Sequence, residues 1–281
     1  MNGRITMKTI TVAAIQPRPV SETMEDFKNG KEVEHALELL DQASEHSIDI
    51  ACFSELYPMV GEKQLCEKAK SLGIYIVAGL LEDGPEGKYN TGTLISPEGT
   101  IIGRQRKSFP TRLEMDMGIQ QWNQTYDIFR TDIGNIGIVI CSDFAFFNVG
   151  IQQLRDKKVD IIFNPSWWFA IGEAYSATVI GRHLEYSVPV IGVNIAKFAL
   201  KAVIDGEVIQ FPPAGGYTTI TISPAVQNLQ ELADWFKAMP GGSNSMKGFV
   251  WILGEEEGIL TRTINIEAVR KFPGYFYTET A

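Results

Sequence analysis

The stretch "GNIGIVICSDFAFFNVG", residues 134–150, contains the pattern that decides the fold class. Its Ile-Gly-Ile-Val-Ile run is uninterrupted by polar residues, which is typical of a strand buried on both faces. The run ends abruptly at Cys141-Ser142-Asp143, where a thiol stands beside a carboxylate. The stretch therefore predicts a core strand of a layered protein, and Cys141 is either a packed core residue or a nucleophile presented at the strand tip.

Strand and helix patterns alternate along the rest of the chain. Strands are predicted at 9–16, 48–53, 74–81, 159–164 and 188–194, and helices at 24–47, 62–73, 149–158, 173–187 and 225–238. Hairpins are predicted at 93–109 and 126–140, and a loop-rich segment at 197–216. The alternation predicts α/β layering, and the hairpins predict that the sheets are mixed. We expect residues 1–281 to form a single domain.

Composition narrows the class of function and the compartment. The net charge is −9 and the pI is near 5.0, which argues against a nucleic-acid surface. No apolar run approaches the roughly 18–20 residues of a membrane helix, and the N-terminus lacks the order of a signal peptide. The three cysteines show no CxxC or metal-ligand spacing, so we expect free thiols, a reducing cytoplasm and no metal.

The histidines argue against several hydrolase mechanisms. Only His35, His46 and His183 occur, and each falls within or at the edge of a predicted helix, where a solvated or capping role is expected. A Cys-His or Ser-His-Asp site needs an imidazole beside the nucleophile. No GxSxG, Walker A or HExxH motif is present either. Another group must therefore activate any nucleophile.

Three chemically useful side chains follow three different predicted strands. Glu55 follows IDIACF, Lys107 follows TIIGRQR, and Cys141 ends IGIVI. Strand tips of layered α/β folds are where loops converge and sites form. A Glu can accept the proton of a thiol, a Lys can stabilise a thiolate and an oxyanion, and Cys is a strong nucleophile at neutral pH. Cys52 and Cys66, inside a strand and a helix, are expected only to pack.

The segments that carry these residues resemble blocks of the nitrilase superfamily, the carbon–nitrogen hydrolases with a Glu-Lys-Cys triad. The similar blocks, in family order from about residue 9 to about 272, are AAIQPRP, DIACFSELYPMVGE, KYNTGTLISPEGTIIGRQRKSF, IGNIGIVICSDFAFF, VDIIFNPSWW, GRHLEYSVPVIGVN and EGILTRTINIEAVRKF. Each block is weak by itself, and the order and spacing make the resemblance specific. It also puts Arg182, Glu185 and Asn194 in the positions expected for the family.

The resemblance implies a four-layer α-β-β-α sandwich with two mixed sheets and a cofactor-free thiol hydrolase. By resemblance the catalytic residues are Glu55, Lys107, Cys141 and, as a second carboxylate, Glu114. The candidate substrate-binding residues are Tyr57, Ser142, Trp167 and Trp168. The expected substrate is a small linear amide or N-carbamoyl compound. Homodimers or larger homo-oligomers are the expected assembly, with no nucleic-acid or membrane partner.

Several positions depart from the family pattern. Ser54 replaces the usual Pro, and Ala145, Phe147 and Asn148 replace the Arg, Pro and Glu of a frequent Cys-x-Asp-x-Arg-Phe-Pro-Glu run. Ser142-Asp143 after the nucleophile is similar to amidases and carbamoylases, whereas true nitrilases usually carry Trp-Glu. Three alternatives remain open at this point: a nitrile hydrolase, an amine acyltransferase and a catalytically weak binding member. Asp143 either supports the nucleophile loop or caps the following helix.

Overall fold

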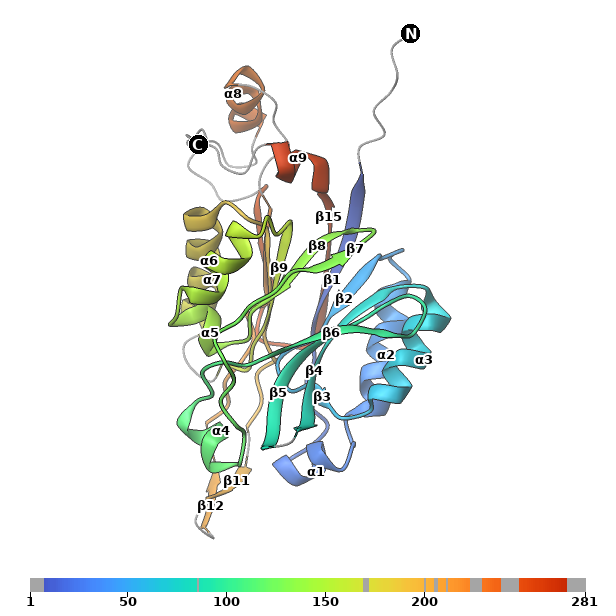
Figure 1. Ribbon diagram of the computed structural model, residues 1–281, viewed down its shortest axis with the longest axis vertical. Coiled ribbons are helices and arrows are strands. Elements are labelled where there is room, and N and C mark those ends of the chain that lie inside the picture. Colours follow the sequence, from blue (N-terminus) through green and yellow to red (C-terminus); the bar gives the residue numbers. More distant parts are fainter. Residues whose placement is uncertain are drawn as a thin grey trace.

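Two β-sheets pack against each other, and helices cover the outer face of each sheet (Figure 1). The computed structural model describes residues 8–84, 86–168, 172–199, 201–204, 207–210, 212–222, 229–238 and 248–271. The predicted four-layer α-β-β-α sandwich with two mixed sheets is confirmed.

The first sheet combines parallel strands with an antiparallel hairpin. Its main path in space is β15 (Gly258–Asn265), β1 (Thr9–Gln16), β2 (Ile50–Cys52), β4 (Tyr75–Gly84), β5 (Gly87–Ile95) and β6 (Ile101–Arg106), and β3 (Pro58–Met59) also pairs with β4. Strands β1, β2 and β4 are parallel, whereas β5 is antiparallel to both β4 and β6. As a result β2, β4 and β6 all end at the same edge of this sheet.

The second sheet has the same mixed character. Its spatial order is β14 (Val250–Ile252), β13 (Thr219–Thr221), β10 (Val190–Val193), β9 (Ile161–Pro165), β8 (Gly134–Ile138) and β7 (Phe129–Thr131). Strands β8, β9 and β10 are parallel, and β7, β13 and β14 pair antiparallel with their neighbours. The tips of β8 and β9 therefore lie side by side.

The helices form the two outer layers. The blue helices α1 (Met24–Lys28), α2 (Val33–Ser44) and α3 (Glu62–Leu72) lie beside the first sheet, and α5 (Ser142–Ala145), α6 (Val149–Asp156) and α7 (Gly172–Tyr186) lie beside the second (Figure 1). The remaining described helices are α4 (Arg112–Asp116), α8 (Leu229–Ala238) and α9 (Ile266–Lys271). Helix α3 ends at Gly73, as predicted, in a left-handed conformation with φ 67°.

Alternate residues of the central strands serve different cores. In β1, Val12 and Ala14 face the core between the sheets, whereas Ala13 and Ile15 face α1–α3. This double burial explains why the strands are apolar at successive positions. Cys52 is fully buried in the core between the sheets, so its predicted packing role is confirmed.

The predicted single helix at 24–47 is wrong, because the chain forms α1 and α2 with a turn between them. Gly30 lies in the turn with φ +83°, a conformation that favours glycine. Glu32 is fully buried just before α2, and its carboxylate accepts hydrogen bonds from the backbone of Val20 and Ser21 at 3.2 and 2.7 Å. In the sequence, Glu32 looks like part of the exposed charged face of one long helix. In the structure its carboxylate is buried and holds the loop at Val20 and Ser21.

The predicted loop at 197–216 also needs correction, because it contains the antiparallel hairpin β11 (Lys201–Ile204) and β12 (Glu207–Gln210). All residues of β12 are exposed, so no buried hydrophobic pattern marks the strand. The intervening Asp205-Gly206, a dipeptide typical of hairpin turns, lies outside the described residues. The predicted helix at 225–238 starts at Leu229, and residues 225–228 likewise lie outside the description.

Among the helices of the described ranges, none combines the length and the apolar character that crossing a membrane requires.

Candidate active site

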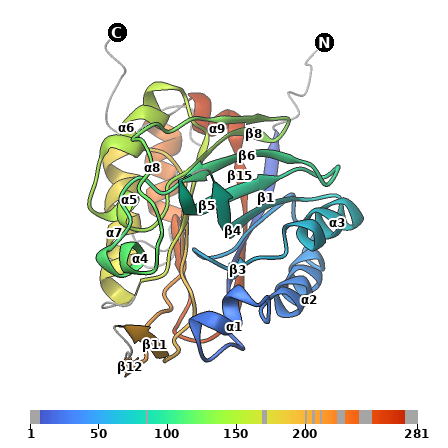
Figure 2. The ribbon, with the colours of Figure 1, turned by 60° about the horizontal axis from the view of Figure 1, so that its bottom comes forward.

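Four strand tips converge at one end of the sandwich. Residues that follow β2, β6, β8 and β9 bring Glu55, Lys107, Cys141 and Trp167 to one cavity. Helices α1 and α4 lie at the same end (Figures 1 and 2). The convergence follows from the topology, because β2 and β6 end at one edge of the first sheet and β8 and β9 end together in the second.

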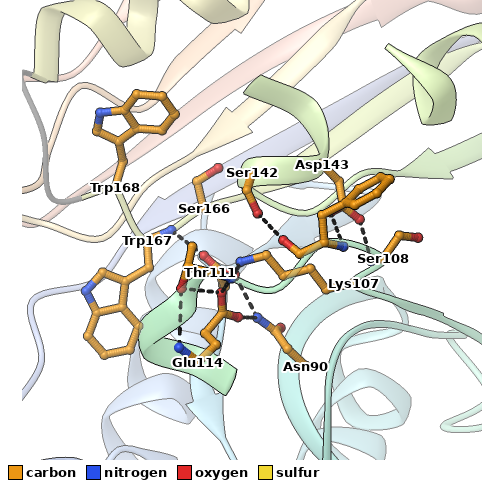
Figure 3. Close-up of polar contacts among 12 residues, drawn as sticks. Asn90, Lys107, Ser108, Thr111, Glu114, Ser142, Asp143, Ser166, Trp167 and Trp168 are labelled. Carbon is orange, nitrogen blue, oxygen red and sulfur yellow. Dashed lines mark hydrogen bonds and ion pairs between the residues drawn. The ribbon is translucent and has the colours of Figure 1, made fainter. Parts of the chain in front are cut away.

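A buried ion network occupies the half of the site built by the first sheet. The Lys107 ammonium donates to Glu55 Oε1 and Glu114 Oε2, both at 2.6 Å. Asn90 Nδ2 donates to Glu55 Oε1 and to Glu114 Oε1, both at 2.7 Å. Figure 3 shows Lys107, Glu114 and Asn90 gathered in this network. Since Lys107 is only 1% exposed, its charge is stabilised by these two carboxylates instead of water.

The network shifts the pKa values of its members in different directions. Burial, reinforced by Glu114, raises the pKa of Glu55 above 4.5 even though Lys107 opposes the shift. For Glu114, the attraction of Lys107 and the hydrogen bonds from Thr111 and Asn90 outweigh burial and lower the pKa. Burial opposes the charge of Lys107, but the acidic groups around it raise its pKa well above 10.5. Glu55 is therefore the carboxylate most ready to take a proton.

Helix capping holds Glu114 in the network. The Thr111 hydroxyl accepts from Glu114 N at 3.3 Å, and the Thr111 backbone N–H and hydroxyl donate to Glu114 Oε2 at 2.8 and 2.9 Å. This is a capping box at the start of α4. One carboxylate oxygen thus both caps a helix and pairs with Lys107.

Glu55 also connects the two sheets. Its Oε2 accepts from the backbone N–H of Trp167 at 2.9 Å, and its own N–H donates to Ser166 O at 3.4 Å. A Cβ at Gly79 of β4 would lie 2.4 Å from the backbone nitrogen of Leu56, so the turn that carries Glu55 can approach β4 only because residue 79 is glycine.

Cys141 occupies a strained backbone position at the tip of the second sheet. Its φ of 42° and ψ of −107° are rare for a residue with a side chain. The Cys141 N–H donates to Pro165 O at 3.0 Å, which fixes the turn to β9. The thiol and the Glu55 carboxylate line the same cavity and are close enough for each to shift the pKa of the other. Burial and the nearby Glu55 raise the thiol pKa, so the resting group is a neutral thiol that needs a base.

Asp143 links the Cys141 segment to the Lys107 segment. Its carboxylate accepts from the backbone N–H groups of Ser108 at 2.7 Å and Phe109 at 2.9 Å and from the Tyr126 hydroxyl at 2.7 Å. Figure 3 shows Asp143 beside Ser108. The carboxylate is fully buried, and burial raises its pKa against these hydrogen bonds. Asp143 had two predicted roles, and these contacts agree with the first, which is support of the loop that carries Cys141.

Arg182 of α7 holds the other end of α5. Its guanidinium donates to the carbonyl oxygens of Phe144 and Ala145 at 3.2 and 3.3 Å and pairs with Glu185 at 2.8 Å. Cations at a helix C-terminus are favourable because the terminal carbonyls lack helical partners. The two family-like residues Arg182 and Glu185 thus support the short helix after Cys141 and do not line the cavity.

The cavity itself is small and has an apolar wall. Its volume is about 90 Å³. It is lined by Met24, Glu55, Leu56, Lys107, Thr111, Leu113, Glu114, Met117, Cys141 and Trp167. The ion network and the thiol contribute part of this lining, and methionine, leucine and tryptophan side chains contribute an apolar wall.

Not all predicted binding residues lie on this cavity. Trp167 lines it, whereas Trp168 points the opposite way, toward Phe146 and Tyr175 at ring distances of 5.6 and 5.9 Å (Figure 3). Tyr57 is fully buried, and its hydroxyl pairs with His35 Nδ1 at 2.8 Å. Tyr57 and Trp168 therefore support the loops around the cavity from outside it.

Ser142 follows Cys141 directly in the chain, but its hydroxyl already has a hydrogen-bond partner. The Ser142 hydroxyl donates to Phe109 O at 2.7 Å. Only its backbone N–H, at the first residue of α5, remains a candidate for contact with a reacting group.

His46 is exposed, as expected, whereas His183 and His35 differ from the expected solvated or capping residues. His183 is 1% exposed and its Nδ1 contacts Val188 O at 2.8 Å, so it is a core residue. His35 lies between Tyr57 and Glu257, with its Nε2 3.1 Å from the Glu257 carboxylate. Neither lines the cavity, which agrees with the argument against a Cys-His site.

Sequence reasoning missed Asn90, Thr111 and most of the apolar wall. Thr111 had a usable signal, because Thr-Arg-Leu-Glu matches the capping-box pattern. Asn90 had none, because it lies in the middle of β5 and reaches the site only through strand pairing. Within the residues the structure describes, no group of His, Cys, Asp and Glu is arranged to hold a metal ion.

Comparisons with known proteins agree with this geometry. The profile of a family described as carbon–nitrogen hydrolase matches residues 11–197. An omega-amidase NIT2 of Xenopus tropicalis is 29% identical over 114 residues, which are 38% of this chain and 41% of the relative. The chain thus matches less than half the length of that curated relative.

Solved structures share the fold at low identity. Nit3 of Saccharomyces cerevisiae, a member of branch 10 of the nitrilase superfamily, has a TM-score of 0.69 and 16% identity, with 94% of each chain covered. An amidase mutant from Nesterenkonia sp. AN1, with the acetamide moiety of fluoroacetamide added covalently at its active-site cysteine, has a TM-score of 0.65 and 15% identity over 94% of this chain and 93% of that one. The chain belongs to the carbon–nitrogen hydrolase family of the nitrilase superfamily.

Proposed function

We propose that this protein hydrolyses the C–N bond of a small amide or N-carbamoyl compound through a thioester on Cys141. One observation carries the proposal: a buried thiol at a strained strand tip lies beside Glu55, whose carboxylate is bonded to Lys107. In this proposal Cys141 is the nucleophile, Glu55 the base and Lys107 the cation, and all three line one small cavity. The proposed triad is Glu55, Lys107 and Cys141.

The first half of the reaction forms the thioester. Glu55 takes the thiol proton, and the sulfur attacks the substrate carbonyl carbon. The oxygen becomes an oxyanion next to the Lys107 ammonium and the backbone N–H of Ser142. When the C–N bond breaks, Glu55 returns the proton to the departing ammonia or amine.

The second half releases the acid. A water molecule gives a proton to Glu55 and its oxygen attacks the thioester carbonyl. The same oxyanion contacts apply, and the C–S bond breaks as the thiolate leaves. Glu55 then reprotonates the sulfur, which restores the resting site. The raised pKa of Glu55 suits a group that must both accept and return a proton.

The second carboxylate, Glu114, is proposed to hold Lys107 in place. It pairs with the same ammonium at 2.6 Å, and its pKa is lowered, so it stays charged while Glu55 gains and loses its proton. Lys107 therefore keeps an anionic partner throughout the cycle. Because Glu55, Lys107 and Cys141 are charge-coupled, their protons are expected to titrate together and not one by one.

The covalent adduct at the active-site cysteine of the Nesterenkonia amidase supports a thiol nucleophile in this fold. The omega-amidase relative supports amide chemistry. Free Cys52, Cys66 and Cys141 are consistent with the proposed reducing cytoplasm.

The test is ammonia release from a panel of amides, N-carbamoyl compounds and nitriles by wild type and Cys141→Ala. We expect amide or carbamoyl turnover that the substitution abolishes. Iodoacetamide should label Cys141 before Cys52 or Cys66. Ammonia release that survives the substitution would overturn the mechanism.

We also propose that the protein forms a homodimer through the helices beside the second sheet. Four large apolar residues are exposed on or next to α5, α6 and α7: Phe146, Phe147, Val149 and Leu184. Phe146 is 70% exposed, which is costly for a side chain facing water. Sedimentation of wild type and Phe146→Glu tests this, and a wild-type monomer at micromolar concentration would contradict it.

A further inference from the structure

Large apolar side chains form a wall of the cavity. Met24 comes from the start of α1, Leu113 from α4, Met117 from the turn after it, and Trp167 from the tip of β9. Trp167 is itself fixed by Phe27 and Phe198, with ring centroids at 5.1 and 5.6 Å. An acyl chain bound at Cys141 can therefore contact the carbon and sulfur atoms of these side chains.

The charges that line the cavity are already paired with each other. Lys107 is the one cation among the lining residues in the described part of the chain, and two carboxylates contact it. Its remaining N–H is the group assigned to the oxyanion. The lining set has two carboxyl groups and one ammonium, so it presents no net positive charge to a substrate.

The arginines nearest to Lys107 in the sequence pair with other groups and do not line the cavity. Arg106 makes two hydrogen bonds to Glu82, at 2.8 and 2.9 Å, and its guanidinium lies over the rings of Tyr89 and Trp122. Arg112 pairs with Asp116, and its side chain is 89% exposed. The segment after the nucleophile, Phe-Ala-Phe-Phe-Asn at 144–148, contains neither Lys nor Arg.

These observations limit what can bind. A carboxylate held against the apolar wall would lose its hydration without gaining a cation, which is strongly unfavourable in a buried site. An apolar chain of the same length would be stabilised by burial. An apolar cavity of about 150 Å³ holds benzene, so a cavity of about 90 Å³ suits an acyl group of roughly three to five carbons.

We infer that the substrate is a neutral amide with a short aliphatic acyl chain, and that the site rejects the monoamides of dicarboxylic acids and N-carbamoyl amino acids. The inference rests on the proposed function, because it concerns the acyl group delivered to Cys141. It narrows that function from amides and carbamoyl compounds in general to one chemical class.

A matched pair of amides tests the inference. Butyramide and succinamate share the same chain, and a carboxylate replaces the terminal methyl group in the second. We expect kcat/KM for butyramide to exceed that for succinamate by about 100-fold or more, since an unpaired buried charge is strongly rejected. Ammonia release measured with both amides gives the ratio directly.

Leu113→Arg should narrow this ratio, because it adds a cation to the apolar wall. Ile252→Arg is the matched control, since it adds the same charge at the exposed edge strand β14, where Ile252 is 44% exposed. The control should keep the wild-type ratio. Thermal stabilisation of Cys141→Ala by butyramide, but not by succinamate, gives a readout that needs neither arginine variant to fold.

The possible outcomes distinguish a failure of the proposed substrate class from a failure of the proposed Cys141 mechanism. Equal or faster turnover of succinamate would overturn the substrate class and leave the Cys141 hydrolase intact. Ammonia release from both amides that survives Cys141→Ala would overturn the mechanism as well. Absence of turnover of either amide by the wild type would contradict the substrate class, while turnover of N-carbamoyl compounds by the same preparation would preserve the proposed function.

Discussion

The two sheets supply unlike halves of the same site. The first sheet contributes charge: Glu55, Lys107 and Glu114 are joined by hydrogen bonds at 2.6 Å through one ammonium. The second contributes backbone geometry: Cys141 is held at φ 42° and Trp167 presents its N–H to Glu55. In the proposed mechanism, the charged half contains the group that accepts and returns a proton, and the strained half fixes the position of the Cys141 sulfur. Substitutions in the two halves should therefore fail in different ways.

The largest effect is expected from the strained half, at Cys141. Cys141→Ala removes the proposed nucleophile and should lower kcat by about 10⁴-fold or more, because the proposed covalent intermediate forms on its sulfur. Thermal unfolding should change little. Cys52→Ala is the control: it removes a buried core thiol, so it should lower stability and leave kcat nearly unchanged. Steady-state kinetics and calorimetry on both variants make the comparison.

The next effect belongs to the charged half. Lys107→Met removes the only cation that Glu55 and Glu114 share in the described network, and should lower kcat by about 10³-fold. Unlike the cysteine variant, it should also destabilise the fold by about 3–5 kcal/mol, because two buried carboxylates lose their partner. Adding Glu114→Gln should recover part of that stability. A Lys107→Met protein as stable as the wild type would contradict the buried ion network.

The pH dependence should report Glu55. The base must be ionised to accept the thiol proton, so kcat/KM should rise with pH and level off above the raised pKa of Glu55. Below that pKa, activity should fall tenfold per pH unit, and the limb should lie above the ordinary carboxyl value of 4.5. Glu55→Gln should remove the limb together with most of the activity. An acid limb below pH 4.5 would place the proton on another group.

The pKa of Glu114, the second carboxylate, is shifted in the direction opposite to that of Glu55, and this shift should be visible in the pH dependence of stability. The folded pKa of Glu114 is lowered, so the stability it contributes is present above its unfolded pKa and is lost as the pH falls through the folded one. Glu114→Gln should therefore flatten the acid side of the unfolding profile. Denaturant melts between about pH 3 and pH 6, the window around an ordinary carboxyl pKa, measure this.

The smallest effect is expected at Asp143, which links the segment of Cys141 to the segment of Lys107. Asp143→Asn weakens the acceptor of Ser108 N, Phe109 N and the Tyr126 hydroxyl, and should cost about 1–3 kcal/mol of stability. If Asp143 positions Lys107 relative to Cys141, kcat should fall about tenfold with little change in KM. Tyr126→Phe removes one of the three bonds and should show a fraction of both effects. Unchanged kcat in Asp143→Asn would restrict this residue to folding.

The sequence predicts the strands better than the turns between them. Residues 134–140 had to be a core strand because both faces are apolar, and Ile138 and Val139 do lie in different cores. The break between α1 and α2 was not visible, because a buried glutamate, Glu32, looks like an exposed one in the sequence. Strand β12 was also not visible, because all of its residues are exposed and an exposed strand carries no periodic hydrophobic signal.

Within the site, sequence position indicates which loop a residue is on but not where its side chain points. Trp167 and Trp168 are neighbours, yet one lines the cavity and the other packs on Tyr175. Tyr57 follows Glu55 by two residues and turns to His35. These directions depend on partners far away in the chain, so they follow from tertiary packing and not from local pattern.

The most direct test of the account is to trap the acyl group on Cys141. Enzyme quenched with acid during butyramide turnover should carry one butyryl group on the peptide that contains Cys141, and added hydroxylamine should yield the hydroxamate at the expense of the free acid. Sustained ammonia release with no acylated Cys141 and no hydroxamate, or with the acyl group on Cys52 or Cys66, would contradict it.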